Sequence, residues 1–150
     1  MMDSDFDFSF APSETIYGAR AIKLNTAVQK GCYLGSRNSP CIGISVPGTE
    51  YAPGMLGYTT GPLAVATVGG SPEVAVYGEG RRCLWEVDSG YAGQVHPGDL
   101  LVSYDSGTAR PATPTGPWNQ WVLAISLSFA SGGYCADVKV TIFPWAPTGS

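Results

Sequence analysis

The residues that could carry out catalysis are few and widely separated along the chain. There is one histidine, His96, so a Ser–His–Asp or Cys–His site would have to use it. His96 lies in the segment VHPGD (95–99), where Pro-Gly predicts a turn that leads into a strand. No G-x-S-x-G elbow is present to place a nucleophilic serine beside it. We therefore interpret His96 as a turn residue with a backbone or solvent partner.

Carboxylates are harder to dismiss, because a fold can bring together acids that are distant in sequence. Glu86 and Asp88 fall on the same face of a predicted strand. Both lie near the end of that strand, where acidic side chains are usually solvated. A small carboxylate-dependent hydrolase stays open as an alternative, and it requires two acids with perturbed pKa values in one concave pocket. We expect the chain not to be an enzyme.

The four cysteines, Cys32, Cys41, Cys83 and Cys135, are too far apart for a CxxC redox motif or for zinc-ligand spacing. Cys83 and Cys135 lie in apolar runs and are predicted to be buried thiols. Cys32 and Cys41 flank a turn-rich segment, so a local disulfide between them is an open alternative.

An acidic pattern near the start of the chain resembles part of a calcium-binding loop. Asp3, Asp5 and Asp7, followed by Glu14, match the acidic positions of an EF-hand. However, Phe8 stands where the loop needs glycine, and neither flank predicts a helix. The chain also lacks a G-x-x-x-x-G-K-[ST] phosphate loop. We expect no metal ion and no cofactor.

Composition limits the partners. The chain has 150 residues, enough for one domain with a core of its own, and a net charge of -4. The basic residues form no cluster beyond a single Arg-Arg pair, so nucleic acid is not an expected partner. No apolar run approaches the ~20 residues that span a bilayer, and the acidic start lacks the basic region of a secretory signal. We therefore expect no membrane partner and synthesis in a cytoplasm.

The low content of charge indicates assembly with other proteins. Only 13% of residues are charged, against about 25% in typical soluble domains, and 44% are hydrophobic. Tyrosine, tryptophan, glycine, proline, serine and threonine must then cover much of the surface, and this composition suits protein interfaces. A monomer with a Ser/Thr/Gly-rich surface is the alternative.

The elements are predicted to be short strands separated by turns, in an all-β, single-domain sandwich or barrel of about eight strands. The expected strands are 21–24, 41–45, 63–68, 73–77, 83–87, 100–104, 121–129 and 134–143. In the expected strand 134–143, alternation places residues 138, 140 and 142 on one face. In the expected strand 121–129, it places residues 123, 125, 127 and 129 on one face. Residues 69–72 and 130–133 are predicted hairpin loops. Residues 27–33 could form one helical turn.

We expect an extended N-terminal arm over 1–18, a β domain over 19–146 and a tail over 147–150. In the arm, apolar and polar residues alternate, which would let it add to the sheet of a neighbour. Two long irregular stretches, 46–62 and 105–120, carry stiff aromatic side chains. The candidate interface residues in the arm and these loops are Phe6, Phe8, Phe10, Tyr51, Met55, Tyr58 and Trp118.

Two segments together resemble the capsid cement, or head-decoration, proteins of tailed bacteriophages. They are EVAVYGEG (73–80) and VHPGDLLVSYDSGTARP (95–111), which follow that family's V-x-V-x-G and V-x-x-G-D-L-L-x-S-x-x-x-G-x-A-x-P patterns. Residues 27–45 match an earlier part more loosely, and 121–142 fit a closing hairpin. The 46–62 loop and the Phe-rich arm depart from the pattern.

The resemblance implies a structural role on the exterior of a virion. Copies, as homotrimers, would bind the outside of an assembled phage head and bridge neighbouring major capsid proteins. The binding alternative is a glycan- or receptor-recognising β-sandwich on a virion surface, in which Trp118, Trp121 or Trp145 could stack on sugar rings.

Overall fold

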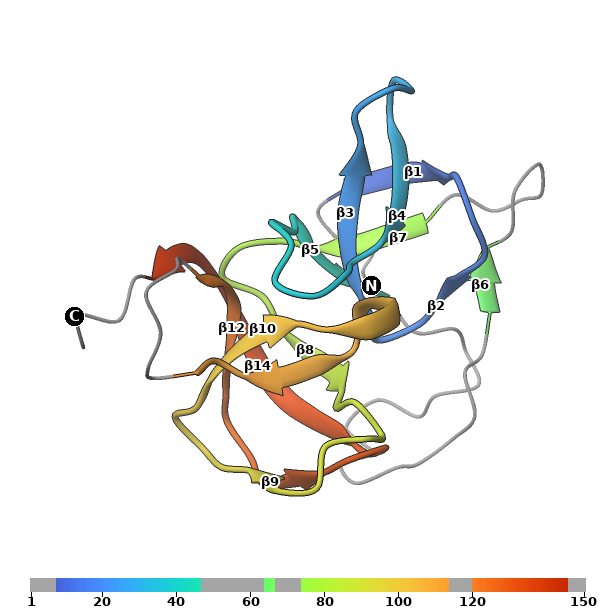
Figure 1. Ribbon diagram of the computed structural model, residues 1–150. Coiled ribbons are helices and arrows are strands. Elements are labelled where there is room, and N and C mark those ends of the chain that lie inside the picture. Colours follow the sequence, from blue (N-terminus) through green and yellow to red (C-terminus); the bar gives the residue numbers. More distant parts are fainter. Residues whose placement is uncertain (1–7, 47–63, 67–73, 114–119, 146–150) are drawn as a thin grey trace, which may run out of the picture.

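The computed structural model describes residues 8–46, 64–66, 74–113 and 120–145, and these form one all-β domain (Figure 1). Within these ranges there is no α-helix, and the only helical element is the 3-10 turn η1 (Asp105–Gly107). The predicted fold class is therefore confirmed. No helix among the described residues is long and apolar enough to cross a membrane.

The strands are short, and their bounds follow in chain order. They are β1 (Phe8–Pro12), β2 (Ile16–Tyr17), β3 (Ala21–Asn25), β4 (Gly31–Leu34), β5 (Gly43–Ser45), β6 (Ala64–Ala66), β7 (Val74–Tyr77), β8 (Arg82–Glu86), β9 (Gln94–Val95), β10 (Leu100–Ser103), β11 (Ala109–Pro111), β12 (Gln120–Ser126), β13 (Ala130–Ser131) and β14 (Cys135–Trp145).

The first half of the chain forms a small closed barrel, in the strand order β1-β4-β3-β5-β7. β1 runs parallel to β4 and antiparallel to β7, so it closes the cylinder. Each of these five strands thus has two neighbours, which shortens the strand edges that could pair with another chain. The barrel interior is filled by a cluster of buried side chains: Ile16, Ile22, Cys32, Leu34, Val74 and Val76.

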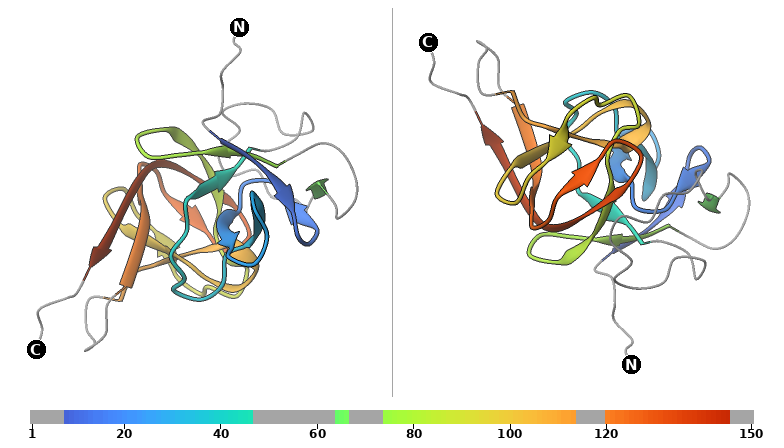
Figure 2. Two further views of the ribbon diagram at one scale, coloured as in Figure 1. Left: turned by 90° about the horizontal axis from the view of Figure 1, so that it is seen from above. Right: turned by 90° about the horizontal axis from the view of Figure 1, so that it is seen from below.

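The second half forms a five-stranded sheet in the order β11-β10-β12-β14-β8. Barrel and sheet lie side by side in all views (Figures 1 and 2). The larger core cluster lies on this sheet around Trp85, which is fully buried and donates its indole N–H to the carbonyl of Gly107 at 2.8 Å. Two further pairs, β13-β9 and β2-β6, complete the fold.

Strand β3 connects the two cores. Ala21 and Ile22 follow each other along the strand, and neither has any exposed surface. Because successive side chains of a strand point to opposite faces, Ile22 packs in the barrel whereas Ala21 packs in the cluster of the sheet. The two halves therefore share an element and form one packed body.

The N-terminal segment differs from the free arm expected over 1–18. Phe8–Pro12 is strand β1 of the barrel, paired with β7 and β4 of the same chain, and Ile16–Tyr17 is β2. Phe10 packs partly buried against the barrel core. The apolar residues Phe8 and Phe10 thus belong to a strand of the barrel. Strands β4 and β7 of the same chain supply the backbone pairing that we expect from a neighbouring molecule on the sequence alone. Residues 1–7 and 147–150 lie outside the described part.

The facing of β12 also differs from expectation. Its ladder with β10 pairs Leu101 with Ala124 but Val102 with Val122, so Leu123 is an extra residue on β12 and is buried together with both of its neighbours. A bulge of this kind inserts one residue into the strand and breaks the strict alternation of inward and outward side chains at that point. Further along, Leu127 is 44% exposed whereas Ser126 is fully buried, so the expectation that 123, 125, 127 and 129 share one face is wrong.

Three smaller expectations are also corrected. β6 pairs with β2 and β7 with β1 and β5, so the predicted hairpin through 69–72 does not join the segments on its two sides. The last three residues of the predicted helical turn over 27–33 belong to strand β4. The stretch 105–120, predicted to be irregular, contains η1 and β11. The antiparallel pairing of β12 with β14 is as predicted. Of the predicted hairpin loop 130–133, the first two residues form strand β13, which pairs with β9.

Candidate docking surfaces and a polar pocket

The structure places His96 on a surface turn, as expected. The backbone N–H of His96 donates to the Asp99 carboxylate at 2.8 Å, and Gly98 has a φ of +93°, which glycine adopts without strain. The imidazole packs edge-on against Phe129, with ring centroids 5.4 Å apart. These contacts of His96 hold the turn together rather than form a nucleophile–base pair.

The carboxylates singled out from the sequence are both ion-paired. Asp88 lies 2.7 Å from the guanidinium of Arg110. Glu86 is buried rather than solvated, and it lies 3.3 Å from the Arg20 guanidinium. Burial raises the pKa of Glu86 above its ordinary value, although Arg20 opposes this rise. Each acid therefore has an arginine partner within the fold.

All four cysteines are free and buried, so the possible Cys32–Cys41 disulfide is not formed. Burial raises the pKa of Cys83 and of Cys135 to about 12. It also raises the pKa of Cys32 to about 11, with a smaller contribution from the nearby charge of Glu14. Such thiols stay protonated and unreactive near neutral pH. No group of three or more potential metal ligands occurs among the described residues.

Of the predicted interface residues, few lie in the described ranges. Phe10 is partly buried against the barrel, and for Phe8 the structure describes the backbone in β1. Five others lie outside the described residues: Phe6, Tyr51, Met55, Tyr58 and Trp118. The described surface instead presents three apolar groups that the sequence did not single out as a set.

The first group, which we call the turn patch, consists of His96, Leu127 and Phe129. Phe129 is 59% exposed and Leu127 is 44% exposed. The supporting backbone is fixed, because the Gly98 N–H donates to the Ser126 carbonyl at 2.8 Å and the Leu127 N–H donates to the Asp137 carbonyl at 2.7 Å. Exposed apolar side chains on a rigid frame lose little entropy when a partner covers them.

The second group, the ribbon patch, lies at the outer end of the β12–β14 pair. Trp121 is directly opposite Pro144, and Ile142 lies two residues before Pro144, so all three share one face. Trp121 and Ile142 are 37% and 38% exposed. Asn38 accepts the Trp121 N–H and Glu79 accepts the Ile142 N–H, while proline has no N–H. These caps block strand addition, so a partner would contact side chains here.

The third group, the hairpin patch, is formed by Leu24 and Val28 at the β3–β4 hairpin. These residues are 46% and 52% exposed. The hairpin tip projects away from the barrel at the top of Figure 1. The three patches therefore lie on different structural elements, which suits a protein that contacts more than one neighbour.

An arginine–tyrosine stack stiffens the surface beside the ribbon patch. The guanidinium carbons of Arg37 and Arg110 lie 4.4 and 4.0 Å from the centre of the Tyr104 ring. Arg37 is held by Asp105 at 2.7 Å, and Arg110 by Asp88. The two arginines and Tyr104 border a cavity of about 300 Å³. Arginine and tyrosine are common anchors of protein interfaces.

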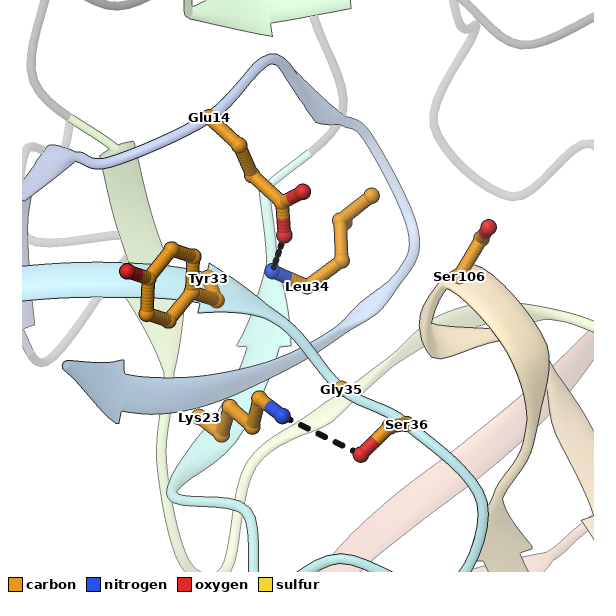
Figure 3. A pocket seen from close by; sticks show the side chains of 7 residues that line it. All are labelled: Glu14, Lys23, Tyr33, Leu34, Gly35, Ser36 and Ser106. Carbon is orange, nitrogen blue, oxygen red and sulfur yellow. Dashed lines mark hydrogen bonds between the residues drawn. The ribbon is translucent and has the colours of Figure 1, made fainter.

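A larger pocket of about 380 Å³ opens where β1 leaves the barrel wall (Figure 3). The pairing of β1 with β4 ends at Pro12 and Cys32. Beyond it, the Leu34 N–H donates to the Glu14 carboxylate at 2.8 Å instead of to a strand carbonyl. Lys23 donates to the Ser36 hydroxyl at 3.1 Å. Tyr33 lies beside Lys23 on the neighbouring strand, and Ser106 of η1 closes the far side. The pocket thus has one acidic and one basic side chain.

No protein-family model matches the sequence, and no curated protein matches it. A solved structure that does match is the crystal structure of the head fiber gp8.5 N base in bacteriophage phi29. The TM-score is 0.59, and the match covers 89% of this chain and 92% of that chain. The two chains share a fold. Their sequences are 14% identical, so the likeness establishes the architecture and not the function.

Proposed function

We propose that this chain is a structural protein of a phage virion that binds the exterior of the assembled head as a cement protein. The observation that carries the proposal is the shared fold with the phi29 head fiber base, which extends over most of both chains. The resemblance of residues 73–80 and 95–111 to head-decoration proteins supports it from the sequence alone.

The proposed partner is the major capsid protein, and the proposed contacts are the three apolar patches. A cement protein must hold at least two neighbours, so it needs contact areas that point in different directions. The turn patch, the ribbon patch and the hairpin patch lie on separate elements of a rigid frame. Interfaces of roughly 1,200–2,000 Å² would suffice when they are repeated across a shell.

The energetic mechanism is linkage between binding and assembly. A ligand that binds the assembled shell, and not its separated subunits, stabilises the shell by the free energy of binding. No covalent chemistry is required.

We also propose that the chain binds as a homotrimer, as the resemblance to head-decoration proteins implies. Light scattering on the purified protein measures its molar mass, and the proposal expects three times the 15.7 kDa of the chain. A mass that stays at one chain at all concentrations would reject the trimer but leave head binding open.

The heating of undecorated heads tests cementing. Purified protein is added to heads that lack their own decoration protein, and shell rupture is followed by release of the enclosed DNA as temperature rises. Cementing predicts rupture at a higher temperature, with a shift that grows with protein concentration and saturates. An unchanged rupture temperature at saturating protein would contradict it.

The same fold likeness favours a second candidate role, as the base of an appendage on the head. In that role the domain would bind the head in the same way and also hold a further segment or protein. Electron microscopy of decorated heads separates the two roles. Low knobs favour cement, whereas projections that extend beyond one domain favour a base.

A further inference from the structure

The polar pocket of Figure 3 has features of a ligand site that docking on a shell does not use. Its walls come from parts of the chain that are distant in sequence: Glu14 in the link from β1 to β2, Lys23 on β3, residues 33–36 at the end of β4, and Ser106 on η1. Its volume of about 380 Å³ falls at the lower end of the range for small-molecule sites, roughly 300–1,000 Å³.

The two charged side chains limit which ligands fit. Glu14 uses one carboxylate oxygen to accept the Leu34 N–H at 2.8 Å, and Lys23 donates to Ser36 at 3.1 Å. These contacts fix the position of both groups and leave each with further hydrogen-bonding capacity. The Glu14 carboxylate would repel an anion, and the Lys23 ammonium would repel a cation. A neutral ligand that has both hydrogen-bond donors and acceptors can donate to the carboxylate and accept from the ammonium.

The remaining walls add hydroxyl groups and an aromatic ring. Ser36 and Ser106 each offer a hydroxyl that both donates and accepts. Tyr33 is drawn between Glu14 and Lys23 in Figure 3, and it stands opposite Lys23 in the β3–β4 ladder, so these two side chains share one face. An aromatic ring presents an apolar face next to polar groups. This combination matches a sugar ring, which carries hydroxyls at its rim and C–H groups on its faces.

We propose that this pocket binds a neutral saccharide unit. A single sugar has few heavy atoms, so the expected dissociation constant is on the order of 1 mM. The proposal does not rest on the docking role, because none of the pocket residues belongs to the three apolar patches. Shell binding and sugar binding can therefore succeed or fail separately.

The test is a titration of the 15N-labelled protein with neutral monosaccharides, followed by the amide signals in two-dimensional NMR spectra. We expect saturable shifts at Leu34, Gly35 and Ser36, with smaller shifts elsewhere. Glycerol and glycine are the comparison ligands, because glycerol is a polyol without a ring and glycine is a zwitterion. No saturable shift with any neutral sugar, or saturation by glycine or glycerol at equal or lower concentration, would overturn the proposal.

Three variants then separate binding in the pocket from binding elsewhere. Glu14→Gln retains an acceptor for the Leu34 N–H but removes the charge, and Lys23→Met removes the ammonium. We expect each to weaken neutral-sugar binding about tenfold, which is typical for loss of a hydrogen bond to a charged group. Lys139→Met, at an exposed lysine of β14, is the control and should bind as the unaltered protein does.

The two pocket variants should also change ligand preference in opposite directions. Without the acid, the pocket should accept the anion glucuronate better, and without the ammonium it should accept the cation glucosamine better. Unaltered sugar affinity in both variants, with native spectra retained, would place any binding outside this pocket and would overturn the proposal.

Discussion

Arg20 of the barrel and Glu86 of the sheet form a buried ion pair at the junction of the two halves. The side chains are only 5% and 9% exposed, and the nearest nitrogen–oxygen distance is 3.3 Å. Arg20 also donates to the Ser106 carbonyl at 2.9 Å, and the Glu86 N–H donates to the Ala19 carbonyl at 2.9 Å. Through Arg20, the Glu86 carboxylate of the sheet is thus connected to Ser106 of η1, which lines the polar pocket.

Removing the arginine should destabilise the fold strongly. Arg20→Met leaves the Glu86 carboxylate buried without its partner, and breaking a buried pair in this way costs about 3–5 kcal/mol in the free energy of unfolding. The control is Arg37→Met, because the Arg37–Asp105 pair is 63% and 56% exposed, and such pairs contribute less than about 1 kcal/mol. Urea denaturation measures both. Equal losses in the two variants would show that the Arg20–Glu86 pair is not critical.

The loss in Arg20→Met should also depend on pH. Burial already raises the pKa of Glu86 in the folded protein, and Arg20 restrains this rise, so the pKa rises further without Arg20. A raised carboxyl pKa favours the folded state at low pH, and this contribution is lost as pH increases through the folded pKa. The deficit should therefore shrink as pH falls from 7 towards the ordinary carboxyl value of 4.5. A deficit that grows on acidification would contradict this.

Gly107 should not tolerate a side chain. Its φ is +76°, and a Cβ at this position would lie 2.6 Å from the Ala21 carbonyl oxygen. Gly80 offers a matched control, with a φ of +89° and nothing within 4 Å of the added Cβ. Gly80→Ala should cost about 1–2 kcal/mol of unfolding free energy from backbone strain alone. Gly107→Ala should cost clearly more, and equal midpoints in urea would refute the close packing of η1 on β3.

The four thiols should be inert in the native protein. At pH 8, a disulfide reagent such as Ellman's should react with all four only after denaturation. Since the pKa of Cys83 and of Cys135 rises from 9.0 to about 12, these groups favour the folded state below pH 9.0, and this contribution is lost as pH rises towards 12. Rapid labelling of any native thiol at pH 8 would mean that its site opens to solvent.

The turn patch should contribute to head binding without supporting the fold. Leu127→Ser and Phe129→Ser together remove the two most exposed apolar side chains of this patch. If they anchor the interface, affinity for assembled heads should fall at least tenfold, while the urea midpoint changes little. Lys139→Ser is the surface control and should bind normally. Unchanged affinity in the double variant would remove the turn patch from the interface.

Fold class and most strands could be predicted from the sequence because alternation and turn residues are local signals. The facing of β12 could not, because the bulge at Leu123 arises only when β12 pairs with β10. For this reason Leu127 and Phe129 were expected on the same face as buried Leu123. The barrel role of Phe8–Pro12 likewise depends on partners more than sixty residues away in β7. The Arg20–Glu86 pair is also a long-range contact without a local signal.

The candidate docking residues chosen from the sequence stay predictions. Sequence reasoning selected aromatic residues in long loops, and most of these lie outside the described ranges. The patches found on the described surface combine residues from separate turns and strands, such as His96 with Phe129. The predicted turn at Pro97-Gly98 and the tryptophan Trp121 are the sequence features that point to two of these regions.

The most direct test of the proposed function is co-sedimentation of the purified protein with undecorated phage heads and, in parallel, with unassembled major capsid protein. We predict saturable binding to heads at a fixed number of copies per capsid subunit, and little or no binding to the unassembled protein. Absence of saturable binding to heads, or equal affinity for unassembled subunits, would contradict a role as head cement.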